Sequence, residues 1–237
     1  MVGKGTLFLI PTIIAEDTVQ VVIPQQVLMA LKDIRFFLAE NPRTARRYLS
    51  SLKIYDAIES LTFEVLNKET KEAELSALMA PSIDGFNIGV ISESGCPGVA
   101  DPGSMAVRFA HQNGISVVPL VGPSSIVLAL MASGLNGQSF AFHGYLPVEA
   151  KEAARAIREL EKESSVKHQT QLFIETPYRN NHVLDHLLTS LKPTSILSIA
   201  LDLTGQNQFI QTKTVKEWKV NKPSLPKEPA IFSFIAD

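Results

Sequence analysis

Residues 86–104, FNIGVISESGCPGVADPGS, give the clearest indication of the architecture. The apolar run Phe86–Ser92 predicts a buried strand, and the glycine- and proline-rich stretch Ser92–Ser104 predicts a rigid loop that leads into a helix over Ser104–Gln112. In an open α/β sheet, ligands bind at the carboxyl ends of strands, where such loops lie. The loop contains neither G-x-G-x-x-G nor Gly-Lys-Ser/Thr, which excludes a dinucleotide fingerprint and a P-loop.

Strand-like and helix-like segments alternate on both sides of this region, as in an α/β protein. In the first half, the other expected strands are Thr6–Ile10, Ile34–Ala39 and Ile115–Pro119, and the other expected helices are Gln25–Leu31, Pro42–Leu52, Lys68–Met79 and Ser124–Ser133. Asn41 suits the cap of the helix that begins at Pro42. Helix Ser124–Ser133 has almost no polar residues, so we expect it to be buried on most of its sides.

The second half of the chain differs because its strands follow one another more closely. The expected strands are Ser139–His143, Gln171–Ile174, Ser195–Leu201, Gln208–Thr212 and Glu228–Ile235, and the expected helices are Glu149–Glu163 and Tyr178–Ser190. A polar turn at Thr204–Asn207 between two strands favours a mixed sheet. The predicted fold is α/β with two domains: residues 1–120 with a mostly parallel sheet, and residues 121–237 with a mixed sheet.

Composition limits the class of protein further. The chain has 237 residues, of which 45% are hydrophobic, with 22 Lys and Arg against 24 Asp and Glu. The apolar content predicts a packed core, and the formal net charge of −2 argues against binding to nucleic acid or membrane through bulk charge. A single cysteine excludes a disulfide framework and a cysteine-based zinc site, so we expect a cytoplasmic protein. The apolar runs are too short or too often interrupted to span a bilayer, so no membrane partner is expected.

A second loop repeats the arrangement of strand, glycine and proline, and helix. This loop, Pro119–Ser125 (PLVGPSS), favours a site shared with Ser92–Ser104. Cys96 has no neighbouring histidine and is interpreted as a packing residue, while His143 is interpreted as a hydrogen-bonded structural histidine. The remaining histidines form no metal-ligand pattern, so no metal is expected.

Six short motifs follow one another along the chain. They are SESGCPGVADPG at Ser92–Gly103, VVPLVGPS at Val117–Ser124, ASGL at Ala132–Leu135, FAFHGYLP at Phe140–Pro147, ETPYR at Glu175–Arg179 and LDLT at Leu201–Thr204. Taken together they resemble the tetrapyrrole methylase superfamily, the class III S-adenosylmethionine-dependent methyltransferases. Within it, the chain is most similar to the family that methylates a cytidine ribose 2′-oxygen in small-subunit ribosomal RNA.

This resemblance implies a cofactor and the residues that contact it. Members bind S-adenosylmethionine in a cleft between two α/β domains, largely through backbone groups, and are typically homodimers. The residues that correspond to cofactor contacts here are Pro11, Ser94, Gly95, Cys96, Val99, Ser125, Ile126, Glu175, Leu203, Pro229 and Ala230. The implied reaction moves a methyl group from a sulfonium centre to an acceptor oxygen, so the protein must position the acceptor and remove its proton.

The acceptor side departs from the family pattern. The family segment A-E-D-T-R-x-T corresponds to AENPRT at Ala39–Thr44, and the acceptor-site candidates that this implies are Glu40, Asn41 and Arg43. The segment Ile10–Asp17 (IPTIIAED) lacks the Gly-Asn of the family, and Leu201 replaces the arginine of R-E-L-T. These departures leave the methylated atom and the general base unassigned.

Three functions are therefore compared. The preferred one is a methyltransferase that acts on a ribose of ribosomal RNA in the small subunit, for which a basic cluster should line the acceptor site. Such a cluster is available on one helix, although a solvated face is its simpler interpretation: Arg43, Arg46 and Arg47. An apolar trough would instead indicate a tetrapyrrole or another small planar acceptor. A blocked acceptor mouth would indicate a cofactor-binding protein without catalysis.

Overall fold

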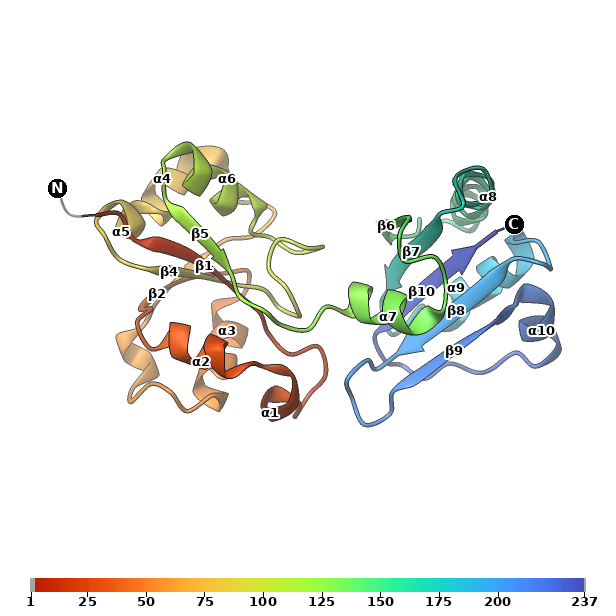
Figure 1. Cartoon of the computed structure of the whole chain (residues 1–237), viewed down its shortest axis with the longest axis horizontal. Coiled ribbons are helices and arrows are strands. Elements are labelled where there is room, and N and C mark those ends of the chain that lie inside the picture. Colours follow the sequence, from red (N-terminus) through yellow and green to blue (C-terminus); the bar gives the residue numbers. More distant parts are fainter. Residues whose placement is uncertain (1–2, 237) are drawn as a thin grey trace. The chain divides into compact units, whose positions relative to one another are not determined.

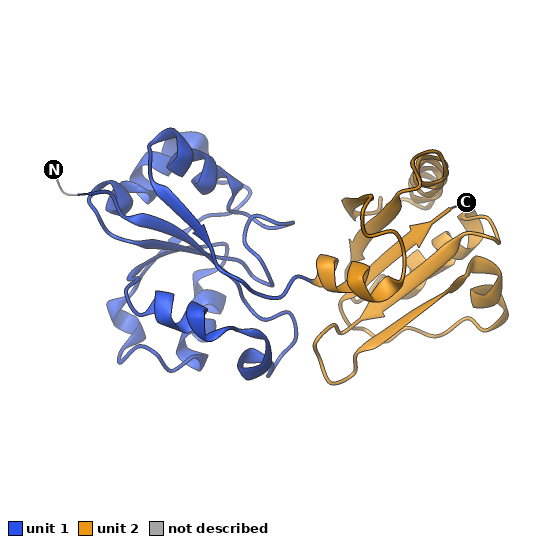
Figure 2. Cartoon of the chain, viewed as in Figure 1, with its two compact units in different colours: residues 1–124 blue, residues 125–237 orange. Residues whose placement is uncertain are grey.

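The first of two units, residues 1–124, contains a sheet whose strands are all parallel (Figure 2). The computed structural model describes residues 3–236. In this unit the strands are β1 (Thr6–Ile10), β2 (Phe36–Ala39), β3 (Thr62–Val65), β4 (Ile88–Ile91) and β5 (Ser116–Pro119). They pair in the order β3-β2-β4-β1-β5, and the predicted parallel sheet is confirmed.

Helices cover both faces of this sheet because neighbouring residues of a strand point to opposite faces. Ile10 and Phe37 belong to the hydrophobic cluster of one face, and Leu7 and Leu38 belong to that of the other. The helices of the first face are α1 (Val19–Val22), α2 (Gln25–Leu31) and α3 (Pro42–Ser51), and those of the second are α4 (Leu75–Leu78), α5 (Ala80–Ile83) and α6 (Ser104–Gln112) (Figure 1). The central strand β4 is buried along its whole length, as expected for a strand covered on both faces.

The chain leaves β4 toward one face of the sheet and leaves its two neighbours toward the other. Strand β4 lies between β2 and β1. After β1 the chain enters α1 and α2, and after β2 it enters α3, whereas after β4 it enters α6 on the opposite face. Crevices that bind ligands open at the carboxyl ends of strands where such a switch occurs. A ligand-binding crevice is therefore expected beside the loop after β4.

The second unit, residues 125–237, contains a mixed sheet. Its strands are β6 (Phe140–Tyr145), β7 (Thr170–Glu175), β8 (Ile196–Leu201), β9 (Phe209–Thr214) and β10 (Ala230–Ile235). They pair in the order β6-β7-β10-β8-β9, and the pair β6 and β7 is parallel while the others are antiparallel. The predicted mixed sheet is confirmed.

The main core of this unit lies on one face of the mixed sheet. Phe173 of β7 stacks on Phe232 of β10 with ring centroids 5.8 Å apart, and both side chains are completely buried. Helices that pack over them are α8 (Ala150–Lys167), α9 (Asn180–Ser190) and α10 (Val215–Val220), while α7 (Ser125–Ser133) lies on the opposite face (Figure 1). Trp218 of α10 donates from its indole nitrogen to the Leu197 carbonyl oxygen, at 2.9 Å, which anchors α10 to β8.

The helix expected at Lys68–Met79 is a wrong prediction in its first turn. The side-chain oxygen Oδ1 of Asn67 accepts from the backbone N–H groups of Glu69 and Thr70, at 2.8 and 3.1 Å, and this holds the segment in a turn. Helical structure begins only at a short 3₁₀ helix, Glu72–Glu74, and continues through α4 and α5. An asparagine side chain that bonds to nearby backbone N–H groups competes with the helix in this way.

The expectation that the apolar helix is buried on most sides is also wrong. Helix α7 buries Ile126, Ala129 and Leu130, but Val127 and Met131 are 49% and 74% exposed. A helix that packs against a single sheet covers only one of its faces, whatever the composition of the others. Elements that were not expected include the four-residue helix α1, the edge strand β3 with its exposed residues, and the six-residue helix α10.

Within residues 3–236, no helix combines the length and the apolar character needed to cross a bilayer.

Replacing Phe232 by alanine should reduce the free energy of unfolding by about 3–5 kcal/mol, because it removes a completely buried ring and leaves a cavity beside Phe173. Urea denaturation followed by tryptophan fluorescence measures the change. The matched control is Phe140→Ala on the edge strand β6, where the ring is 44% exposed and the loss should stay below about 1 kcal/mol. Equal losses in the two variants would contradict this packing.

Candidate functional site

The glycine-rich loop after β4 has the backbone conformation that its sequence predicted. Gly95, Gly98 and Gly103 have φ angles of +73°, +78° and +141°, a region that favours glycine. The Gly95 carbonyl oxygen accepts from the backbone N–H of Thr12, at 2.9 Å, and from the Ser92 hydroxyl, at 3.1 Å. The loop after β4 is thereby bound to the loop after β1.

The loop after β5 joins the same group. A Cβ atom on Gly122 would lie 2.1 Å from Cβ of Pro11, so only glycine allows these two loops to approach so closely. The Cys96 sulfur lies 3.4 Å from the Pro123 carbonyl oxygen, and partial burial raises the pKa of this thiol. Cys96 is thus a packing residue between two loops, as predicted. Three loops at the carboxyl ends of β1, β4 and β5 form one connected structure.

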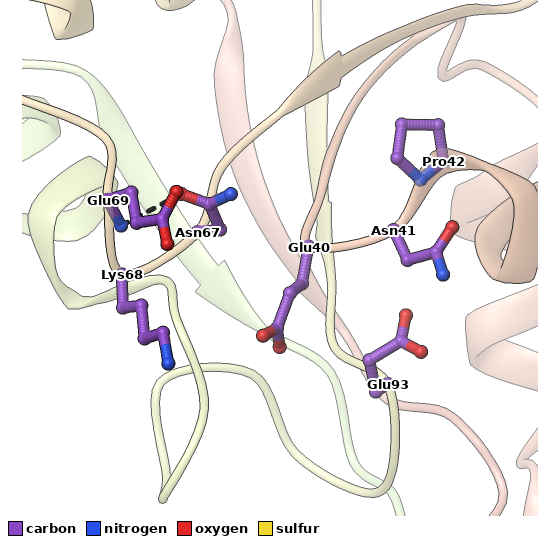
Figure 3. A pocket seen from close by; sticks show the side chains of 7 residues that line it. All are labelled: Glu40, Asn41, Pro42, Asn67, Lys68, Glu69 and Glu93. Carbon is purple, nitrogen blue, oxygen red and sulfur yellow. Dashed lines mark hydrogen bonds between the residues drawn. The ribbon is translucent and has the colours of Figure 1, made fainter.

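Two pockets lie at this edge of the sheet, both within the first unit. The smaller one, about 370 Å³ in volume, opens between the ends of β2 and β4 (Figure 3), and its lining residues are Glu40, Asn41, Pro42, Asn67, Lys68, Glu69 and Glu93. Two of the predicted acceptor-site residues, Glu40 and Asn41, therefore line it. Arg43 does not line it, and the Asn41 side chain instead caps α3 by accepting from the Arg43 backbone N–H at 3.0 Å.

Acidic groups gather around the smaller pocket. The carboxylates of Glu40 and Glu93 point into it from the ends of β2 and β4 (Figure 3). Burial, together with the charges of Glu40 and Glu93, raises the pKa of Asp101 to about 6. Sequence reasoning missed Glu93 and Asp101 as site residues, although both belong to the motif at residues 92–103. In residues 3–236, no three His, Cys, Asp or Glu side chains are arranged to hold a metal ion.

The larger pocket, about 510 Å³ in volume, lies between the loop after β1 and helix α3. Its apolar lining includes Ile13, Ile14 and the ring of Tyr48, and Arg47 contributes a cation. The Tyr48 hydroxyl donates to the Pro11 carbonyl oxygen at 2.9 Å, and burial raises the pKa of this phenol. Three segments quoted in the sequence analysis contribute to its lining, at residues 12–17, at Thr44 and at residues 92–94, but the sequence did not show that they meet around one pocket.

The three arginines of α3 are exposed, and within the described residues none forms an ion pair with a carboxylate. The Arg46 guanidinium lies 4.7 Å from the centroid of the Phe63 ring, which restrains it by a cation–π interaction. Exposed cations without carboxylate partners remain available to an anionic ligand. They are Arg43, Arg46 and Arg47.

In the second unit, several predicted cofactor contacts share one edge of the mixed sheet. Ala230 pairs with Glu175 of β7 on one side and with Leu201 of β8 on the other. Because β7 and β8 run in the same direction, the backbone of Glu175, Pro229 and Leu203 meets at this edge, where Leu203 is also buried. Ser125 and Ile126 begin α7, on a separate element.

Buried side-chain oxygens without hydrogen-bond partners also occur at this edge. Within residues 3–236 they are Glu175 Oε2, Asn180 Oδ1 and Thr204 Oγ1. Glu175 Oε2 lies 3.4 Å from a guanidinium nitrogen of Arg179 as an ion pair, while Oε1 accepts from the Thr176 backbone N–H at 2.7 Å. Buried polar atoms usually have partners, so this group indicates a place for ligand donors. His143 lies elsewhere and pairs with Gln171 at 2.5 Å, in a structural contact as predicted.

Two proteins of the same name are related to the chain in sequence. No family model matches the chain. The chain is 32% identical over 216 residues to ribosomal RNA small subunit methyltransferase I of Halalkalibacterium halodurans, and the match covers 90% of this chain and 70% of that protein. It is 30% identical over 217 residues to the protein of the same name from Vibrio cholerae, covering 91% and 70%. The chain thus spans about 70% of the length of these relatives.

Solved structures share the fold. One is the methyltransferase CobJ, with a TM-score of 0.59, 17% identity, and coverage of 99% of this chain and 94% of that one. Another is the uroporphyrin-III C-methyltransferase of Thermus thermophilus, with a TM-score of 0.54, 17% identity, and coverage of 97% and 91%. At this level of identity the match concerns the fold alone, and it confirms the predicted tetrapyrrole methylase-like architecture.

The titration of Asp101 tests the acidic cluster. In Glu40→Gln, the pKa of Asp101 should fall below about 6 but stay above the ordinary value of 3.8, because one negative neighbour is lost while burial remains. Carbon-13 NMR of the Asp101 carboxyl group follows this pKa. The control is Glu72→Gln, outside the pocket lining, which should leave the pKa unchanged. An Asp101 pKa unaffected by Glu40→Gln would show that the two groups are too far apart to interact.

The same pKa has a consequence for stability. A carboxyl group whose pKa is raised by folding contributes stability below pH 3.8, and this contribution is lost as the pH rises through about 6. Asp101→Asn should therefore gain stability relative to the wild type between pH 4 and about pH 7. Urea denaturation at several pH values measures the difference, and a pH-independent difference would contradict the raised pKa.

Proposed function

Since the chain belongs to the ribosomal RNA small subunit methyltransferase I family, we propose that it transfers a methyl group from S-adenosylmethionine to small-subunit ribosomal RNA. The observation that carries this proposal is identity of 32% extending over 90% of the chain. By its resemblance to the family, the proposed acceptor atom is the 2′-oxygen of a cytidine ribose. Membership of this family makes the chain a methyltransferase. Its cofactor, its acceptor and the residues that bind them are what we propose.

The loop after β4 offers donors that fit the charged methionine end of the cofactor. The backbone N–H groups of Ser94, Gly95 and Cys96 donate to no group within residues 3–236. Successive free backbone N–H groups in a turn suit a carboxylate. Gly95 has no side chain to cover them. Pro11 lies near this loop, because the next residue, Thr12, donates its backbone N–H to the Gly95 carbonyl oxygen. Val99, 50% exposed on the same loop, offers an apolar contact.

The edge of the mixed sheet in the second unit offers acceptors that fit the adenine end. Adenine carries an exocyclic amino group with two N–H donors. Asn180 Oδ1 is buried without a hydrogen-bond partner, and Glu175 Oε2, which also forms an ion pair with Arg179, accepts no hydrogen bond within residues 3–236. Buried Leu203 and Ala230 provide an apolar surface beside them. Pro229 and the start of α7 at Ser125 and Ile126 complete the set proposed from the family resemblance.

The chemistry requires a proton acceptor. When bound, S-adenosylmethionine would supply an electrophilic methyl group to the acceptor oxygen and would leave as S-adenosylhomocysteine. The acceptor hydroxyl loses its proton in this step, so a carboxylate within reach accelerates the reaction. We place this function in the group Glu40, Glu93 and Asp101. A pKa of about 6 leaves Asp101 mostly ionised at neutral pH and still basic enough to accept a proton.

Location and assembly follow from the proposed substrate and family. Ribosomal RNA as the acceptor implies a cytoplasmic enzyme that acts on the small ribosomal subunit or its RNA. The family resemblance further implies a homodimer.

Gly95→Arg should abolish binding of S-adenosylmethionine, because the side chain covers the free N–H groups and its Cβ atom would lie 3.2 Å from the Pro123 carbonyl oxygen. The control is Gly114→Arg, which shares the positive φ of +62° but lies after α6, where only the end of Lys4 comes within 4 Å. Isothermal titration with S-adenosylmethionine and S-adenosylhomocysteine measures both variants and the wild type. Absence of binding to the folded wild type would contradict the cofactor assignment.

The acceptor is tested with tritiated S-adenosylmethionine and small ribosomal subunits from cells that lack this protein. Incorporation of label into RNA, at a ribose after nuclease digestion, is the expected result. Label that enters a tetrapyrrole but not RNA would overturn the proposed acceptor, and binding without transfer to either would indicate a protein that binds the cofactor without catalysis.

A further inference from the structure

Of the residues that line the larger pocket of the first unit, the mechanism described above uses only Glu93 and Ser94. The pocket lies between the loop after β1 and α3, and Thr44, Tyr48 and Ser51 line it from positions on one face of that helix. It also reaches Ser92, Glu93 and Ser94 at the end of β4. A ligand held there would therefore lie beside the loop proposed to bind the cofactor.

The lining of this pocket combines apolar side chains with exposed polar ones. Ile13, Ile14 and the Tyr48 ring supply apolar surface. Ser51, Glu16 and Asp17 are exposed residues of the lining, and their side chains can form hydrogen bonds. A volume of about 510 Å³ lies within the range of pockets that hold small organic ligands. These features suit a planar ring with polar edges.

From these observations we propose that the pocket receives a single nucleoside, unstacked from the RNA strand, while the arginines of α3 bind the phosphates on either side of it. This inference rests on the proposed function. Proteins that read RNA bind bases taken out of the stack, and an enzyme that modifies one nucleotide must bring that nucleotide to its cofactor.

The distribution of charge favours this occupant over an anionic small molecule. Glu16, Asp17 and Glu93 are exposed residues of the lining, so their negative charges would repel a phosphate or carboxylate inside the pocket. A neutral base is not repelled by these carboxylates, and its amino groups can donate hydrogen bonds to them. The cations lie instead on the exposed surface of α3, where Arg43 and Arg46 are available to phosphates and Arg47 also borders the pocket. A neutral ring inside and a charged backbone outside match a nucleotide within a strand.

The substitution Ser51→Trp tests the pocket, because a large ring at this exposed lining position fills it. The matched control is Ser50→Trp, on the neighbouring residue of α3, which does not line the pocket. We expect Ser51→Trp to raise the KM for small ribosomal subunits at least tenfold and to leave the Kd for S-adenosylhomocysteine within twofold of the wild type. Equal KM values for the two tryptophan variants would overturn the pocket proposal.

Arg47→Gln provides a second test that does not depend on filling the pocket. Removing one cation that binds a phosphate reduces the slope of log Kd against log salt concentration by about 0.7–0.9. We expect such a reduction for binding of small ribosomal subunits, and none for Arg158→Gln, an exposed arginine of α8 in the second unit. An unchanged slope for Arg47→Gln would overturn the phosphate contact.

The outcome for the wild type separates this inference from the proposed function. A wild type that transfers no methyl group to RNA overturns the function itself. An active wild type whose Ser51→Trp and Arg47→Gln variants behave like their controls overturns the nucleoside pocket alone.

Discussion

The direction in which the chain leaves β4 is the constraint on which the candidate site depends. Strands β1 and β2 flank β4 and send the chain to one face of the sheet, while β4 sends it to the other. Two crevices follow, one on each side of the end of β4, and Glu93 lines both pockets. The central strand β4 is tightly packed at Gly89, where a Cβ atom would lie 2.3 Å from the Ile10 side chain.

Hydrogen bonds then fix the loops that this topology brings together. The Gly95 carbonyl oxygen accepts from Thr12 and Ser92, while the Tyr48 hydroxyl holds Pro11 from α3. Glycine is required where the loop after β5 packs against the Pro11 ring, at Gly122. A loop held by such contacts keeps its own N–H groups in place for a ligand, so that less ordering is needed on binding. In the proposed function, the carboxylates that line the pockets and the exposed arginines of α3 act together on the RNA substrate.

Much of this could be predicted from the sequence, because local patterns determine strands, caps and glycine-rich loops. Strand β1 and helices α2 and α6 have the predicted bounds, and Asn41 caps α3 as expected. The prediction failed where a side chain competes with the backbone, as at Asn67, and where burial depends on distant partners, as for Met131. The larger pocket and the acidic cluster around Asp101 could not be predicted, since they arise from residues that only the folded sheet brings together.

A residue-resolved NMR titration of the labelled protein with S-adenosylhomocysteine tests the proposed cofactor site most directly. We expect the backbone N–H signals of Ser94, Gly95 and Cys96 to shift strongly, because these donors have no partner within residues 3–236. The signals of Gly85 and Gly114, near the opposite edge of the same sheet, should stay in place. Binding that shifts Gly85 and Gly114 and leaves the loop after β4 unchanged would contradict the claim that the carboxyl edge binds the cofactor.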